Sequence, residues 1–186
     1  MTSDPHYKAK AYKKVLEKEE EFHIKPWELS VVWGKDKRYW SVPDPNDTRK
    51  DPHIELLQVS WLEVTGSIKL KDFAKPGKYN VSFRIGMKKD AFGWSGMPVY
   101  IMAKIGKKGK YIWRSANIAH KDDSTNFEIP EGAPLQIDIP DPDDCIEDEE
   151  LHFGLYEVWK GRWKGGLQIY EAIIKPAETK IKIASN

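Results

Sequence analysis

Three turn-rich segments interleave aromatic rings with charged or small residues: 35–40 (KDKRYW), 91–96 (AFGWSG) and 157–166 (EVWKGRWKGG). An exposed indole can stack on the apolar C–H face of a sugar ring, and a carboxylate can accept hydroxyl protons in charge-assisted hydrogen bonds. The same residue types suit single-stranded nucleic acid, whose bases stack on rings while lysines follow the phosphates. The segments therefore predict a binding surface and leave these two ligand classes open.

The tryptophans divide by their surroundings in the sequence. Trp33 and Trp61 lie in strand-like patterns, which predicts that their side chains belong to the core. Trp40, Trp94 and Trp163 lie in turn-rich loops, where ligand contact is expected as readily as burial.

Motifs for catalysis or metal binding do not stand out. The five histidines are scattered without metal-ligand spacing, and the segment 93–97 (GWSGM) misses the GxSxG pattern by its second glycine. The acidic turn at 141–146 departs from a calcium loop at its fifth and sixth positions. Cys145 is the single cysteine, which excludes an internal disulfide, and the acids around it predict an unreactive thiol. We expect no catalytic residue, no metal and no cofactor.

Charge is balanced overall but divided along the chain. The net charge is +1, yet residues 69–121 carry thirteen Lys and Arg against two acids, and residues 122–157 carry thirteen acids and neither Lys nor Arg. No apolar run reaches the about 18 residues of a membrane span. The polar N-terminus lacks a secretory signal, so a reducing compartment is expected, and classical secretion is not.

The elements that must position these segments are strands. Residues 7–22 predict a short helical arm that Pro26 closes, because Ala, Leu, Lys and Glu form helices well. Apolar residues then recur with a period of two, most clearly at Tyr79, Val81, Phe83 and Ile85. Strand-like segments follow one another to residue 185 without an intervening helix: 27–33, 53–70, 78–87, 98–106, 111–118, 127–130, 135–139, 151–159, 166–176 and 179–185. This pattern predicts an all-β protein, an antiparallel β-sandwich of jelly-roll type.

The order and spacing of several blocks resemble the phloem protein 2 family, which includes the Nictaba-type plant lectins. The blocks are WELSVVWGKDKRYW, IELLQVSWLEVTGSI, KYNVSFRI, AFGWSGMPV and LHFGLYEVWKGRWKGGLQI, and the resemblance covers roughly residues 27–176. It implies a lectin domain over 27–186 behind an arm at 1–26. It also implies a non-catalytic protein of the cytosol and nucleus, or of phloem sap, that binds N-acetylglucosamine oligomers, as in chitin, or N-glycan cores.

The resemblance also implies a binding site. Trp33 and Trp40 match a tryptophan pair linked to sugar binding, and Glu157 matches a glutamate that accepts sugar hydroxyls. Together with the turn-rich segments this gives one set of candidate carbohydrate-binding residues: Trp33, Trp40, Phe92, Trp94, Glu157, Lys160, Trp163 and Lys164.

Two alternatives remain open on the sequence alone. The basic segment 69–121 favours an RNA-binding protein, and the charged halves favour a structural or interaction protein that self-associates, for instance as a homodimer. The dependence of binding on salt separates RNA binding from sugar binding, since nucleic-acid affinity falls steeply with ionic strength and the affinity for a neutral sugar does not.

Overall fold

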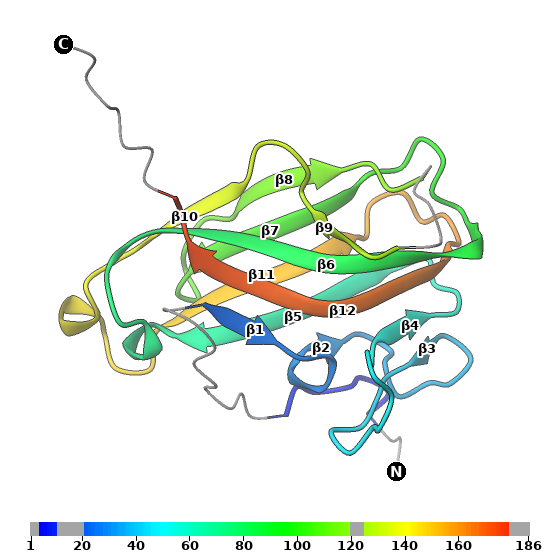
Figure 1. The fold of residues 1–186 in the computed structure, drawn as a ribbon, viewed down its shortest axis with the longest axis horizontal. Coiled ribbons are helices and arrows are strands. Elements are labelled where there is room, and N and C mark those ends of the chain that lie inside the picture. Colours follow the sequence, from blue (N-terminus) through cyan, green and yellow to red (C-terminus); the bar gives the residue numbers. More distant parts are fainter. Residues whose placement is uncertain (1–3, 11–20, 120–124, 179–186) are drawn as a thin grey trace.

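Two antiparallel sheets form the protein (Figure 1). The computed structural model describes residues 4–10, 21–119 and 125–178. The seven-stranded sheet has the order β10-β6-β12-β4-β3, with β1 beside β12 and β9 beside β6; the five-stranded sheet has the order β2-β5-β11-β7-β8. The strands are β1 (Phe22–Ile24), β2 (Ser30–Val31), β3 (Trp40–Ser41), β4 (Ile54–Leu56), β5 (Leu62–Lys69), β6 (Gly77–Phe92), β7 (Val99–Ile105), β8 (Ile112–Ala116), β9 (Phe127–Ile129), β10 (Leu135–Ile139), β11 (Glu150–Glu157) and β12 (Gly165–Pro176).

The sheets share one apolar core, as the alternation in the sequence predicts. Tyr79, Val81, Phe83 and Ile85 of β6 all point into it and are buried. From the other sheet, Phe153 of β11 meets Phe83 with ring centroids 6.4 Å apart. Because successive residues of a strand point to opposite faces, apolar residues at every second position all lie on the face that packs in the core. The prediction of an all-β antiparallel sandwich is confirmed.

The predicted helical arm at 7–22 is not present where the structure describes the chain. Tyr7 pairs with Val31 as an isolated β-bridge, and Phe22 begins β1. Residues 11–20, on which most of the helix prediction rests, lie outside the described residues, as does the strand expected at 179–185. Three short 3-10 turns, η1 (Pro26–Glu28), η2 (Leu70–Asp72) and η3 (Pro142–Asp144), are the helical elements of the described part. None of the helices there has the length and apolarity to cross a membrane.

β1 belongs to the sandwich, although the sequence places it in the arm. Its residues pair antiparallel with β12, from Phe22 opposite Ile174 to Ile24 opposite Ala172. Both Phe22 and Ile24 are buried in the shared core. The expected domain boundary after residue 26 therefore separates a strand from the sheet that it completes.

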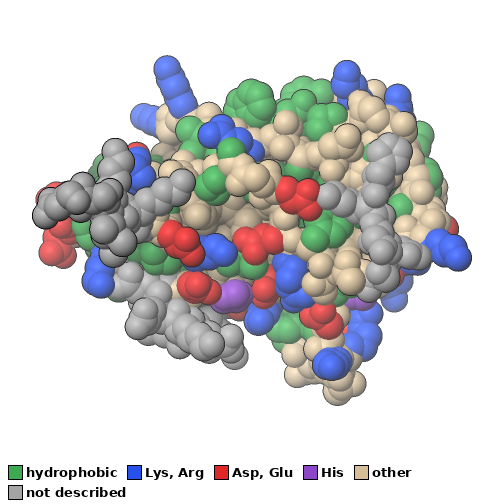
Figure 2. Space-filling model, turned by 45° about the horizontal axis from the view of Figure 1, so that its top comes forward, with side chains coloured by type: hydrophobic (Ala, Val, Ile, Leu, Met, Phe, Trp, Pro, Cys, Tyr) green, Lys and Arg blue, Asp and Glu red, His purple; other side chains and the backbone are tan. Residues whose placement is uncertain are grey.

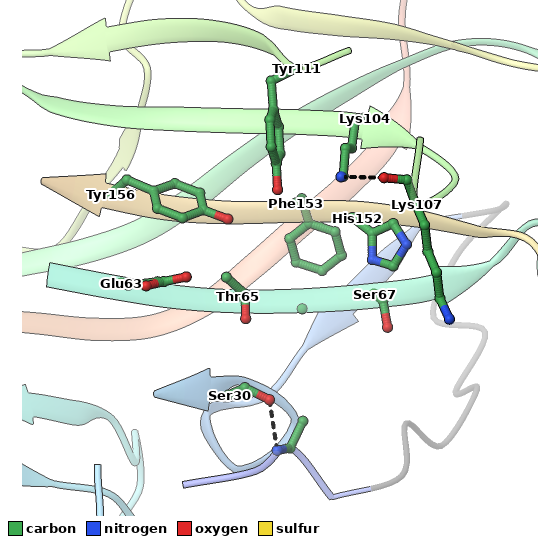
Figure 3. A pocket seen from close by; sticks show the side chains of 12 residues that line it. Ser30, Glu63, Thr65, Ser67, Lys104, Lys107, Tyr111, His152, Phe153 and Tyr156 are labelled. Atoms are coloured by element: carbon green, nitrogen blue, oxygen red, sulfur yellow. Dashed lines mark hydrogen bonds between the residues drawn. The ribbon is translucent and has the colours of Figure 1, made fainter. Parts of the chain in front are cut away.

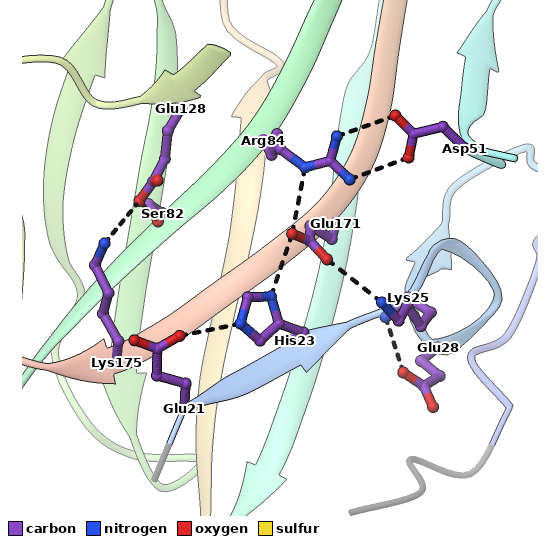
Figure 4. Close-up of polar contacts among 10 residues, drawn as sticks. All are labelled: Glu21, His23, Lys25, Glu28, Asp51, Ser82, Arg84, Glu128, Glu171 and Lys175. Carbon is purple, nitrogen blue, oxygen red and sulfur yellow. Dashed lines mark hydrogen bonds and ion pairs between the residues drawn. The ribbon is translucent and has the colours of Figure 1, made fainter. Parts of the chain in front are cut away.

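A network of ion pairs covers the outward face of the seven-stranded sheet. Arg84 bonds both carboxylate oxygens of Asp51 at 3.2 Å and Glu171 at 3.3 Å (Figure 4). His23 lies between Glu171 and Glu21, at 3.2 and 3.1 Å. Figure 2 shows acidic and basic side chains alternating across this face. The charges on this face therefore neutralise one another across β1, β6 and β12.

Candidate functional site

An aromatic cleft opens at one end of the five-stranded sheet. Its volume is about 210 Å³, and its lining residues are Trp33, Tyr39, Val59, Ser60, Trp61 and Trp163. The three indoles are 42–51% exposed, far more than large apolar side chains in a core. The Tyr39 ring lies between Trp33 and Trp163, with centroids 6.3 Å from each. We call this group of rings the aromatic cleft.

The backbone holds Trp33 in an unusual conformation. Its φ is +65°, in the left-handed region that a bulky residue occupies only at a cost of about 1–2 kcal/mol. Turn hydrogen bonds fix this conformation, from Gly34 N to Val31 O and from Asp36 N to Trp33 O. The backbone N–H of Trp33 donates to His6 Nδ1 at 3.0 Å. The His6 ring also meets the Trp33 indole edge-on, with ring centroids 5.6 Å apart. The surrounding structure therefore holds Trp33 in a strained backbone conformation with its indole at the surface. Such strain is typical of functional positions.

A buried ion pair lies beneath the cleft. Lys164 Nζ donates to Glu157 Oε2 at 2.8 Å, and both side chains are at most 1% exposed. The same ammonium donates to the carbonyls of Ser60 and Arg162, so all three of its protons have acceptors. The backbones of Lys164 and Val59 also exchange two hydrogen bonds. These contacts join the loop that carries Trp163 to the segment that carries Trp61.

The structure changes the expected roles of Glu157, Lys160 and Lys164. Glu157 Oε1 accepts the backbone N–H of Lys160 and Oε2 accepts from Lys164, so the carboxylate is buried with both oxygens engaged. In this structure neither Glu157 nor Lys164 presents a polar atom to a ligand. They position the cleft, and the Lys160 side chain lies exposed in the loop beside it.

Two of the predicted stacking rings are core residues. Trp40 in β3 is 1% exposed and cannot offer a face to a sugar, and its Nε1 is buried without a hydrogen-bond partner. Trp94 is buried and donates to Gly165 O at 2.9 Å. Its loop approaches so closely that a Cβ on Gly93 would lie 2.2 Å from Trp163 O. Phe92 is exposed but lies outside the set of residues that line the cleft.

Conversely, the expectation that Trp33 and Trp61 belong to the core is wrong. Both lie just outside regular strand pairing, where the period-two pattern no longer determines the direction of a side chain. Trp61 Nε1 donates to Glu63 Oε2 at 2.8 Å, which fixes its indole at the mouth of the cleft. Tyr39 and Trp61 are cleft residues missing from the sequence-based set. Tyr39 stands in the KDKRYW segment, next to the tryptophan that the sequence favours.

The arrangement is suited to binding. Exposed aromatic rings and Ser60, which carries a hydroxyl, line the same cleft, a combination that matches the apolar face and the hydroxyl edge of a sugar. Within the described residues no group of three His, Cys, Asp or Glu side chains could hold a metal ion. Cys145 donates to Asp141 O at 3.2 Å, and burial, together with the charges of Glu149, Asp141 and Asp144, raises the pKa of its thiol.

Comparison with known proteins decides the family. A family model described as Phloem protein 2 matches residues 19–176, from just before β1 to the end of β12. The chain belongs to the phloem protein 2 family. The phloem protein 2 match includes β1, in agreement with its place in the sheet.

Three relatives of the chain illustrate the range of similarity. Protein PHLOEM PROTEIN 2-LIKE A9 of Arabidopsis thaliana is 45% identical over 164 residues, which are 81% of this chain and 84% of that protein. Putative F-box protein PP2-B12 of the same plant is 24% identical over 81% of this chain, but the match spans only 59% of its length. A protein named Lectin from Luffa acutangula is 28% identical over 79 residues, 42% of this chain and 37% of its own.

Proposed function

We propose that this protein is a non-catalytic lectin whose aromatic cleft binds N-acetylglucosamine oligomers or the cores of N-glycans. The observation that carries the proposal is the group of three exposed indoles around Tyr39, fixed above a buried ion pair. Exposed tryptophans on a rigid base lose little side-chain freedom when a sugar stacks on them. The similarity of part of the chain to a protein named Lectin supports a carbohydrate as the ligand class.

The acetamido group gives N-acetylglucosamine its place in the proposal. Its methyl suits the apolar space between rings, and its N–H and carbonyl suit a hydroxyl such as that of Ser60, which borders the cleft. We further propose the cytosol and nucleus, or phloem sap, as the site of action, in keeping with membership of the phloem protein 2 family.

Calorimetry with a GlcNAc trimer tests the proposal. A shallow site predicts a dissociation constant between about 1 µM and 1 mM, that is, about −8 to −4 kcal/mol. We expect Trp163→Ala to weaken trimer binding at least tenfold, because it removes an exposed stacking ring of the cleft.

Phe92→Ala is the matched control. It also removes an exposed aromatic ring, but one that does not line the cleft, so trimer affinity should stay unchanged. Equal losses in both variants would place the site elsewhere, and the absence of binding by the wild type to the trimer and to an N-glycan core would reject the proposed function.

A further inference from the structure

A second hollow lies on the outward face of the five-stranded sheet. It measures about 330 Å³, and we call it the sheet trough. In Figure 3, Tyr111 reaches across β7 toward β11, while Glu63, Thr65 and Ser67 follow one another along β5. The strand registers place Tyr156 beside Glu63, Gly154 beside Thr65, and His152 beside Ser67. The trough is therefore built by side chains that three adjacent strands present on one face.

The trough offers hydrogen-bond donors and acceptors with little excess charge. Hydroxyl groups come from Thr65, Ser67 and the two tyrosines. Burial and the neighbouring Tyr111 raise the pKa of Tyr156, so its hydroxyl stays protonated and both donates and accepts. Burial lowers the pKa of His152, which favours the neutral imidazole at neutral pH. A surface of this kind suits a ligand that is rich in hydroxyls and uncharged.

A shelf of aromatic rings continues the trough along the same face. Trp113 and Trp159 each meet the Tyr100 ring edge-on, with centroids 5.7 and 5.0 Å apart. These contacts fix the two indoles, yet they remain 54% and 59% exposed. Tyr100 is the register partner of Tyr156, so the shelf and the trough are neighbours in the sheet. We call Tyr100, Trp113 and Trp159 the aromatic shelf.

Gly154 of β11 lies under the Tyr156 ring, where the absence of a side chain leaves room for that ring. Its position is opposite Met102 on one side and Thr65 on the other. A Cβ there would approach a carbon of the Tyr156 ring to 2.7 Å, so the ring lies directly over the glycine. Any larger residue would displace this tyrosine from the trough.

The trough also adjoins the aromatic cleft. Trp61 lines the cleft and Glu63 lines the trough, and the hydrogen bond of 2.8 Å between their side chains joins the two. A ligand that lies in the cleft and extends past this pair enters the trough.

We propose that the sheet trough and the aromatic shelf form an extended carbohydrate-binding surface, which binds the further residues of a sugar chain longer than the cleft alone can hold. This inference rests on the proposed function of the cleft and adds a class of ligand, the extended neutral oligosaccharide. The trough supplies the polar partners of the sugar hydroxyls, and the shelf supplies ring faces for stacking.

The chemistry of the face favours a sugar chain over the other occupants. Phosphates would meet the Lys104 and Lys107 side chains, but they would also meet the carboxylate of Glu63. A second protein chain would gain most from an apolar patch at the centre of the interface, whereas a hollow with several hydroxyls in its lining lies on this face. A neutral polyol fits both the rings and the hydroxyls.

The test compares GlcNAc trimer with hexamer by calorimetry on the full chain. We expect the wild type to bind the hexamer at least tenfold more tightly than the trimer. This gain is counted beyond the statistical gain of a longer sugar chain, which can place different sets of its residues in the cleft. Trp113→Ala should remove this gain and leave trimer affinity as in the wild type. Ile112→Ala is the matched control, because Ile112 precedes Trp113 in β8 and points to the opposite side of the strand. It should change neither affinity.

The outcomes separate the two proposals. A trimer that binds to the cleft without any hexamer gain overturns the extended surface and leaves the proposed function intact. A hexamer gain that survives in both Trp113→Ala and Tyr111→Ala also overturns it. Loss of salt-sensitive oligouridine binding in Trp113→Ala would assign the face to nucleic acid, and loss of a dimer in sedimentation would assign it to a second copy. If neither sugar binds, both proposals fall.

Discussion

The Glu157–Lys164 pair shows how one contact changes the meaning of a residue. The resemblance to the family implies that Glu157 accepts sugar hydroxyls, whereas the burial of the pair makes it a support of the cleft. Taking two charges out of water is costly, and this pair offsets the cost with four hydrogen bonds to neighbouring groups and to each other. Removing one partner leaves the other charge buried alone.

Glu157→Gln should therefore lower the free energy of unfolding by about 3–5 kcal/mol, measured by urea denaturation. The control is Glu55→Gln, which breaks a more exposed pair, with Lys88 at 2.7 Å. We expect that change to cost less than about 1 kcal/mol. Similar small losses in both variants would show that the Glu157 carboxylate is not a structural support, and would restore it as a candidate for ligand contact.

Trp33 offers the opposite test, because its side chain is exposed and its backbone is strained. Asn adopts the left-handed conformation more easily than Trp, so Trp33→Asn should leave the free energy of unfolding unchanged within about 1 kcal/mol. The same variant should weaken binding of the GlcNAc trimer at least tenfold. A loss of stability above about 2 kcal/mol would show instead that the indole packs as a structural residue.

Among the elements, β1 decides where the folded unit begins. Its two buried side chains, Phe22 and Ile24, close the core beside β12. The described residues before β1 contribute as well, since Tyr7 bridges Val31 through two backbone hydrogen bonds. The strand is too short for a period-two pattern to identify it, and the residues before it form helices well.

Two truncations measure the contribution of β1. Deleting residues 1–24 should cost about 3–6 kcal/mol more than deleting residues 1–20, because the burial of two large apolar side chains is lost and the core that they cover is exposed to water. If the longer truncation does not fold, Phe22→Ala in the full chain gives the same answer, with an expected loss of about 3–5 kcal/mol. Equal stability of the two truncated proteins would return β1 to a dispensable arm.

For the whole molecule, charge distinguishes the candidate ligands. Thirty basic and 29 acidic residues leave a net charge of +1, and the outward face of the seven-stranded sheet neutralises its own charges. GlcNAc trimer affinity should therefore stay nearly constant when salt rises from about 50 to about 200 mM. The affinity for an RNA ligand of which six phosphates contact the protein would fall about a thousandfold over that range. Titrations of trimer and oligouridine at both salt concentrations decide between these ligands.

The fold class could be predicted from the sequence because it depends on a local pattern. Strict alternation at Tyr79, Val81, Phe83 and Ile85 determines which side of β6 is apolar, whatever the rest of the chain does. The residue types in the turn-rich segments likewise determined the chemistry that these segments can offer, namely aromatic rings beside polar groups.

Only the tertiary structure decided which rings reach solvent. Alternation assigns a residue to a face, but burial depends on whether another element covers that face. Trp40 pairs opposite Leu56 and is covered, while the left-handed turn directs Trp33 outward. Glu157 and Lys164 are buried because two distant segments meet above them, at the bridge from Val59 to Lys164. A contact across about a hundred residues of chain leaves no local pattern in the sequence. The roles of these residues could therefore be assigned only from the tertiary structure.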